Sequence, residues 1–174
     1  MKSVVVYESI YGNTRAIAEA IAEGLGGAEV VPVSDAGTPA ADLLVVGGPT
    51  HMHGMASSRS RQAAADAGHE DGAHVEPEAT AEPGLRSWVR DLPDAAGAKA
   101  AAFDTRIDKS AWVTGMASRG IARRLAHRGY EVVGSESFLV QESEGPLEEG
   151  ELDRARSWGA ELAAMLPADA EVTS

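Results

Sequence analysis

Short apolar runs alternate with segments of helical spacing along most of this chain. The runs are too short and too uniformly apolar for the alternating strands of a solvent-facing sheet, and they are typical of buried parallel strands. They lie at residues 3–7, 28–33, 43–46, 98–103 and 130–140. Apolar residues three and four positions apart predict amphipathic helices at 14–25, at 85–92, around Ile121 up to Gly129, and at 152–162.

This alternation predicts an α/β fold with three layers, in which a doubly wound, five-stranded parallel sheet carries helices on both faces. We expect residues 1–166 to form a single domain, because the chain of 174 residues has the length of one domain. The polar composition of residues 65–82 predicts a mobile surface insertion. Residues 167–174 are expected to form a flexible C-terminal tail.

The acidic composition limits the kind of partner. The formal net charge is −12 at pH 7, which argues against nucleic acid and anionic membranes because both attract basic proteins. It suits a partner protein with a basic docking face. The sequence has no cysteine, which excludes thiol catalysis, disulfides and cysteine-ligated metal centres. No apolar run approaches the roughly 20 residues of a membrane helix, and the N-terminus lacks a signal-peptide pattern, so we expect a cytoplasmic protein.

The loop between the first strand and the first helix carries the clearest chemical pattern, Ser9-Ile10-Tyr11-Gly12-Asn13-Thr14. Hydroxyls, a glycine and free N–H groups at a helix N-terminus suit a phosphate group. The ATP/GTP loop would need Gly-Lys-Ser/Thr at its end, and the dinucleotide fingerprint would need three spaced glycines. The alternative is an ordinary strand–helix turn with Asn13 or Thr14 as the helix N-cap.

The pattern Ser9-x-x-Gly12-Asn13-Thr14 after a first strand resembles the FMN-phosphate loop of the flavodoxin family. A second stretch, Gly145-Pro146-Leu147-Glu148-x-Gly150-Glu151 followed by Arg154-Ala155-x-x-Trp158, is similar to one in small bacterial members of that family. By itself it predicts only a turn and a favourable acidic start of the last helix. The resemblance implies the strand order 2-1-3-4-5, with non-covalently bound FMN where the order reverses. The phosphate-binding residues that it implies are Ser9, Tyr11, Gly12, Asn13 and Thr14.

Two further loops would complete such a site at the same end of the sheet. The loop after the third strand would embrace the flavin ring and contributes Pro49, Thr50, His51, Met52, His53 and Gly54. The loop after the fourth strand would close the third side and contributes Phe103, Asp104, Thr105 and Arg106, followed by Trp112. Trp112 is the only large aromatic residue in that loop, where many flavodoxins stack a tyrosine on the flavin. We expect no metal, because the histidine pair would need a third ligand.

An Arg106 side chain that points inward would make the flavin easier to reduce. A cation about 6 Å from an anionic flavin, at an effective dielectric constant near 20, contributes roughly 3 kcal/mol. That free energy corresponds to a shift on the order of 100 mV for one electron.

Three functions are compatible with the sequence. The preferred one is electron transfer by an FMN-binding, flavodoxin-like protein, which needs no catalytic residue because the flavin does the chemistry. The second is an FMN-dependent NAD(P)H or quinone-type oxidoreductase, in which His53 would donate a proton to a quinone oxygen. The third is a non-redox phosphate-binding module. A receiver domain of this kind would need an aspartate after the third strand, where Gly47-Gly48-Pro49 stands.

Overall fold

A computed structural model describes residues 1–51 and 54–167. The sheet strands are β1 (Ser3–Tyr7), β2 (Glu29–Pro32), β3 (Leu43–His51), β4 (Gly54–Met55), β5 (Lys99–Ile107) and β6 (Glu131–Val140). The helices are α1 (Asn13–Gly24), the 3-10 helix η1 (Val33–Asp35), α2 (Ser58–Asp71), α3 (Leu85–Asp91), α4 (Ala111–Thr114), α5 (Ala117–His127) and α6 (Glu151–Ala164). Within these ranges, no helix combines the length and the apolar character that a membrane crossing requires.

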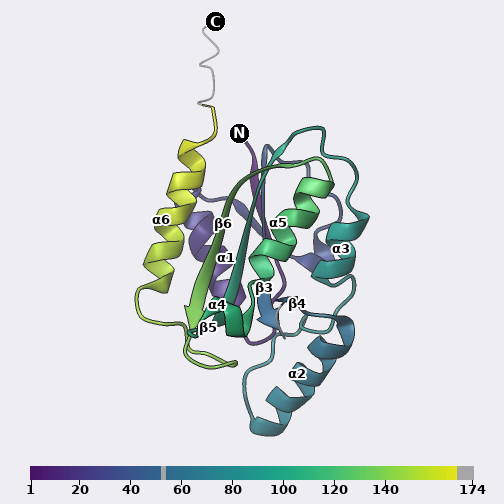
Figure 1. Cartoon of the computed structure of the whole chain (residues 1–174), viewed down its shortest axis with the longest axis vertical. Coiled ribbons are helices and arrows are strands. Elements are labelled where there is room, and N and C mark those ends of the chain that lie inside the picture. Colours follow the sequence, from purple (N-terminus) through teal and green to yellow (C-terminus); the bar gives the residue numbers. More distant parts are fainter. Residues whose placement is uncertain (52–53, 168–174) are drawn as a thin grey trace, which may run out of the picture.

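The sheet has the predicted parallel architecture (Figure 1). Its order is β2-β1-β3-β5-β6, so the five parallel strands follow the order 2-1-3-4-5 when counted along the chain. The short strand β4 pairs with β3 in antiparallel fashion. Val45 of β3 lies between Val5 of β1 and Ala101 of β5, which makes β3 the central strand. The order reverses between β1 and β3, where open sheets of this type bind ligands.

Successive side chains of each strand enter two different cores. Val4 and Val6 point to the face covered by α3 and α5, with Leu85, Ile121 and Leu125 among its buried residues. Val5 and Tyr7 point to the face covered by α1 and α6, with Ile17, Ile21 and Leu162. This alternation follows from the two-residue period of a strand, and it explains why every residue of a central strand is apolar.

Helices α1 and α6 approach each other closely because each has a glycine at the crossing. A Cβ atom at Gly24 would overlap the carbonyl oxygen of Arg156, and one at Gly159 would overlap the carbonyl oxygen of Ile21. The backbones therefore touch where other residues would hold them apart. This crossing fixes the position of α1, whose first turn borders the site described below.

The region expected to be a surface insertion, 65–82, contains structure that the prediction did not include. Residues 58–71 form helix α2, which a reciprocal capping box of Ser57 and Ser60 begins. The segment after it returns to the sheet, where the Glu76 N–H donates to the carbonyl oxygen of Ile10 at 2.8 Å. Mobility of 65–82 stays a prediction, and most of the predicted tail, 168–174, lies outside the described residues.

Candidate functional site

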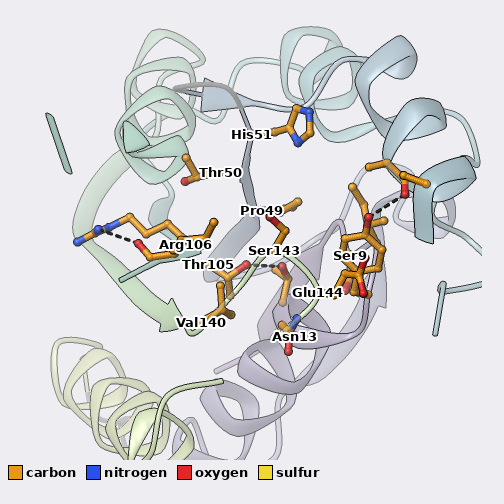
Figure 2. Close-up of a pocket in the computed structure, with 16 residues that line it drawn as sticks. Ser9, Asn13, Pro49, Thr50, His51, Thr105, Arg106, Val140, Ser143 and Glu144 are labelled. Carbon is orange, nitrogen blue, oxygen red and sulfur yellow. Dashed lines mark hydrogen bonds between the residues drawn. The ribbon is translucent and has the colours of Figure 1, made fainter. Parts of the chain in front are cut away.

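A cavity of about 320 Å³ lies at the carboxyl ends of the central strands (Figure 2). Its walls come from the turn between β1 and α1, from the carboxyl ends of β3, β5 and β6, from the loop after β6, and from one side of α2. Its volume is in the range of small-molecule sites. The lining residues are Ser9, Ile10, Tyr11, Asn13, Thr14, Pro49, Thr50, His51, Ala64, Ala67, Thr105, Arg106, Ile107, Val140, Ser143 and Glu144.

The turn from β1 into α1 presents uncapped N–H groups to this cavity. Gly12 is the N-cap residue with a φ of 93°, a left-handed conformation that favours glycine. Its own N–H donates to the Ser9 Oγ at 3.1 Å. No side chain caps the first turn of α1, so the alternative with Asn13 or Thr14 as N-cap is wrong. The amides of that turn are donors that an anion can satisfy.

A hydroxyl pair connects the first loop to the third. The Thr14 and Thr105 Oγ1 atoms lie 2.8 Å apart, and either one can be the donor. Both threonines are buried and both line the cavity. The sequence therefore places two hydroxyls from segments 91 positions apart at one point of the cavity wall.

The segment after α2 supports the turn from its outer side. The buried Glu76 carboxylate lies 3.1 Å from the His74 Nε2 and 3.3 Å from an Arg15 guanidinium nitrogen. A Cβ atom at Gly12 would lie 3.0 Å from the Glu76 Oε1. Position 12 thus favours glycine because of its φ, and the Glu76 carboxylate leaves little room for a side chain there.

Two tyrosines near the turn are held as neutral donors. The Tyr11 hydroxyl donates to the carbonyl oxygen of Ala64 in α2 at 2.7 Å, and burial, followed by the charge of Glu144, raises its pKa. The Tyr7 hydroxyl donates to the Glu78 carboxylate at 3.2 Å. Burial and the Glu78 charge raise the pKa of Tyr7 to about 12. These bonds attach α2 and the segment after it to the first loop.

The end of β3 supplies the second wall. Pro49, Thr50 and His51 line the cavity as expected. The Thr50 Oγ1 accepts a hydrogen bond from the Ala117 N–H at 3.0 Å, which connects this wall to the start of α5. Gly54 lies opposite His51 in the β3–β4 pair and is not a lining residue. The predicted residues Met52 and His53 lie outside the described residues.

The end of β5 supplies the third wall, but Arg106 does not point as the redox hypothesis required. Its guanidinium donates to the carbonyl oxygen of Lys109 at 2.6 Å, and Figure 2 shows the side chain extending away from Ser9 and Asn13. The expected inward cation is therefore absent from this arrangement. The Arg106 Nε is buried and has no partner in the part of the chain described here, which leaves one unsatisfied donor in this wall.

Gly12 shapes the first turn of α1 without lining the cavity, and three further predicted residues do not line it either. Phe103 is fully buried in the core and packs edge to face against Phe138, with ring centroids 6.4 Å apart. Asp104 is also fully buried and accepts a hydrogen bond from the Ser118 N–H at 2.7 Å. Burial raises the pKa of Asp104. Trp112 lies on α4 with 91% of its surface exposed. The first residue of β5 that lines the cavity is therefore Thr105.

Two parts of the cavity wall were not predicted from the sequence. Val140 ends β6, Ser143 and Glu144 follow it, and Ala64 and Ala67 belong to α2. The expected order 2-1-3-4-5 already placed the last strand beside the fourth, so the loop after it was a detectable candidate. The α2 residues carried no comparable signal, because they are small alanines within a polar segment.

The chemistry of the lining residues favours an anion with a flat apolar part. Hydroxyls and amides gather at the first loop, and Pro49, Ile107 and Val140 provide apolar surface elsewhere. Among the described residues, Glu144 is the only carboxylate in the lining. Across the described ranges, no group of three His, Asp or Glu residues is placed to hold a metal ion.

Comparisons with known proteins agree with this geometry. The family model described as Flavodoxin matches residues 5–159. Among solved structures, oxidised flavodoxin 2 from Bacillus cereus is 20% identical with a TM-score of 0.59, and the match covers 95% of this chain and 100% of that one. A flavodoxin from the domain Archaea is 21% identical with a TM-score of 0.57, covering 94% and 97%. Two-electron reduced flavodoxin from Megasphaera elsdenii is 22% identical with a TM-score of 0.54, covering 91% and 98%.

A comparison with curated proteins finds no match. The three solved structures named above are each below 25% identity and show the fold, and the family model shows the relationship because it spans most of the chain. The chain belongs to the flavodoxin family, and this membership implies FMN as its cofactor.

Proposed function

We propose that this protein binds FMN non-covalently in the cavity and carries electrons between partner proteins. The observation that carries the proposal is the first turn of α1, which has no side-chain cap and borders a cavity lined by Ser9 and Thr14. A phosphate monoester satisfies these donors, and its charge is stabilised by the positive end of the helix dipole.

The residues of the chain divide the work of holding the cofactor. Ser9, Asn13 and Thr14 would bind the phosphate, and the ends of β3 and β5 would hold the ring. Ala64 and Ala67 of α2 would exclude water from one side. When bound, FMN supplies the capacity to accept and release electrons. Glu144 at the wall disfavours further negative charge in the cavity, which opposes reduction to an anionic form.

A visible absorption spectrum of the purified protein, before and after FMN addition and removal of the excess, tests the cofactor directly. Gly12→Ala forces a side chain into a left-handed backbone and against Glu76, so we expect FMN affinity to fall more than tenfold. Gly27→Ala is the matched control, because Gly27 has nearly the same φ, 94°, with open space around its Cβ position. Equal FMN affinity in the two variants, or a protein that never retains FMN, would contradict the proposal.

The same samples separate the carrier from an FMN-dependent oxidoreductase. A carrier keeps its flavin bands when NADH or NADPH is added alone and loses them only when a reducing partner is present. Rapid bleaching by NADPH without a partner would overturn the carrier and favour the enzyme. His51 is the residue to change next in that case, since it is the described histidine that lines the cavity.

A further inference from the structure

Cations are distributed unevenly over this acidic protein. Of its 15 lysines and arginines, seven lie within 4 Å of a carboxylate: Lys2, Arg15, Arg61, Arg90, Lys99, Arg154 and Arg156. The other eight, which have no such partner within the described ranges, are Arg59, Arg86, Arg106, Lys109, Arg119, Arg123, Arg124 and Arg128. All eight belong to the start of α2, to α3, to the end of β5 with its loop, or to α5 and the residue after it.

The unpaired charge is densest in α4, α5 and the residues beside them. Residues 109–130 contain five cations and no Asp or Glu. Arg124 and Arg128 donate to the carbonyl oxygens of Gly120 and Arg90. The side chains of Arg119 and Arg123 are exposed and have no hydrogen bond or ion pair to any described residue. Like charges at i and i+4 are unfavourable on a helix, so the fold gains nothing from this arrangement.

An exposed apolar anchor lies next to these arginines. Trp112 is 91% exposed and Val113 is 51% exposed, both in the short helix α4 directly before α5. Tryptophan and arginine are the residue types that most often dominate binding energy at protein interfaces. The apolar side of α5 is not available for a second contact, because Ile121 and Leu125 are fully buried against the sheet.

This surface borders the proposed cofactor cavity. The Ala117 N–H at the start of α5 donates to Thr50 in the cavity wall, and the Arg106 guanidinium bonds to the Lys109 carbonyl. Figure 1 shows α4 beside the ends of β5 and β3. Lys109 lines a neighbouring hollow together with Asp71, Glu142 and Glu144, so the unpaired positive charge beside the cavity comes from α5.

We propose that Trp112, Val113, Arg119 and Arg123, here named the α4–α5 patch, dock a partner protein that presents carboxylates around an apolar recess. The inference rests on the proposed function, because such a partner would exchange electrons through the adjoining cavity. It replaces the expectation of a basic partner, which followed from the net charge of −12 alone. Charge complementarity acts locally, within about 10 Å at ordinary salt, so the local patch outweighs the distant excess of carboxylates.

Two haem proteins of opposite surface charge make the test direct. The probes are cytochrome b5, whose haem edge is rimmed by carboxylates, and cytochrome c, whose haem edge is rimmed by lysines. Each is titrated into the isotopically labelled protein at low salt, and backbone amide shifts are recorded. We expect cytochrome b5 to shift residues 109–124 and cytochrome c to leave them unchanged. Shifts on this segment from cytochrome c, or shifts from cytochrome b5 elsewhere or nowhere, would overturn the proposal.

Variants assign the binding to the patch. We expect Arg119→Glu with Arg123→Glu to weaken cytochrome b5 binding about tenfold, and Trp112→Ala to weaken it about 30-fold, which corresponds to about 2 kcal/mol. Lys2→Glu with Lys99→Glu is the control, since it changes the net charge equally at the amino ends of β1 and β5. A control pair that weakens binding as much as the arginine pair would contradict local docking.

The titration does not need the flavin, so the two proposals fail separately. A protein that retains no FMN but binds cytochrome b5 at the patch removes electron transfer and keeps the docking surface. A protein that retains FMN but does not bind cytochrome b5 at the patch keeps the cofactor and overturns the docking surface.

Discussion

The two faces of the sheet carry helices that treat charge in opposite ways. On the face of α1 and α6, Arg15, Arg154 and Arg156 each pair with two carboxylates. On the face of α3 and α5, Arg119 and Arg123 have no partner in the described structure. The first face neutralises these cations within the chain. On the second face Arg90 of α3 pairs with Asp91, and only the exposed arginines of α5 are the ones that we propose to meet another molecule.

The largest expected contrast comes from adding one methyl group to a helix on each face. Gly159→Ala in α6 forces a Cβ atom onto the Ile21 carbonyl, and we expect a loss of about 3 kcal/mol in the free energy of unfolding. Gly120→Ala in α5 meets only the flexible end of Arg124, so helix propensity should increase stability by up to about 1 kcal/mol. Urea unfolding of both variants measures the contrast, and equal signs would refute it.

Replacing one arginine on each face by alanine should give a smaller difference in the free energy of unfolding. Arg154 pairs with Glu151 at 2.7 Å and lies over the Phe138 ring at 4.5 Å. Because its side chain is 40% exposed, screening limits the expected cost of Arg154→Ala to about 1 kcal/mol. Arg123→Ala should stay within about 0.5 kcal/mol of the parent. Similar losses in the two variants would show that the pairing on the α6 side contributes nothing.

Lowering the pH should change the stability contributed by two carboxyl groups, Glu151 on one face and Asp104 on the other, in opposite directions. Burial alone would raise the pKa of Glu151, but its hydrogen bonds with Arg154 and the Leu139 N–H lower it. The stability it contributes is therefore present above its ordinary pKa and is lost as the pH falls through the lowered one. The pKa of Asp104, which bonds to α5, is raised by burial, so its ionisation destabilises the fold as the pH rises from its ordinary pKa through the raised one.

Unfolding curves between pH 3 and pH 8 measure this difference. Relative to the parent, Asp104→Asn should gain stability as the pH rises, because it keeps an acceptor for the Ser118 N–H without the buried charge. Glu151→Gln should lose stability relative to the parent over the same rise. Parallel pH profiles for the two variants would show that neither carboxyl is perturbed as inferred.

The smallest expected change in stability tests whether the α5 arginines serve the fold or the binding of a partner. Arg123→Glu replaces a like-charge pair with Arg119 by an opposite-charge pair at i and i+4, so stability should rise by about 0.5 kcal/mol. Binding of a carboxylate-rimmed probe should fall in the same variant. A variant that loses stability would show that Arg123 serves the fold.

The sheet was predictable from the sequence because its central strands are continuous apolar runs. Helix α2 was not predictable in the same way. Only Arg61, Ala65 and Gly68 of α2 are buried, and none of them is a large apolar residue that a periodicity search would detect. Helical spacing is present at i, i+4 and i+7, carried by small residues and a buried arginine. The capping serines, Ser57 and Ser60, were the sequence pattern that could have predicted the start of α2.

In the site, alternation along β5 decided which predictions failed. The motif placed residues 103–106 together in a loop, but β5 continues to Ile107, so neighbouring side chains point to opposite faces. Phe103 therefore enters one core and Asp104 bonds to α5 on the other face. The first loop was predictable because all of its chemistry lies within six consecutive residues.

The hydroxyl pair of Thr14 and Thr105 works as a two-member relay. One of its two hydrogens is used between the oxygens, and the other is free to be donated onward. An anion that accepts from Thr14 receives a hydrogen bond polarised by the one that Thr14 itself accepts from Thr105. A change at Thr105, near the end of β5, would therefore be transmitted through Thr14 to the phosphate proposed for this site.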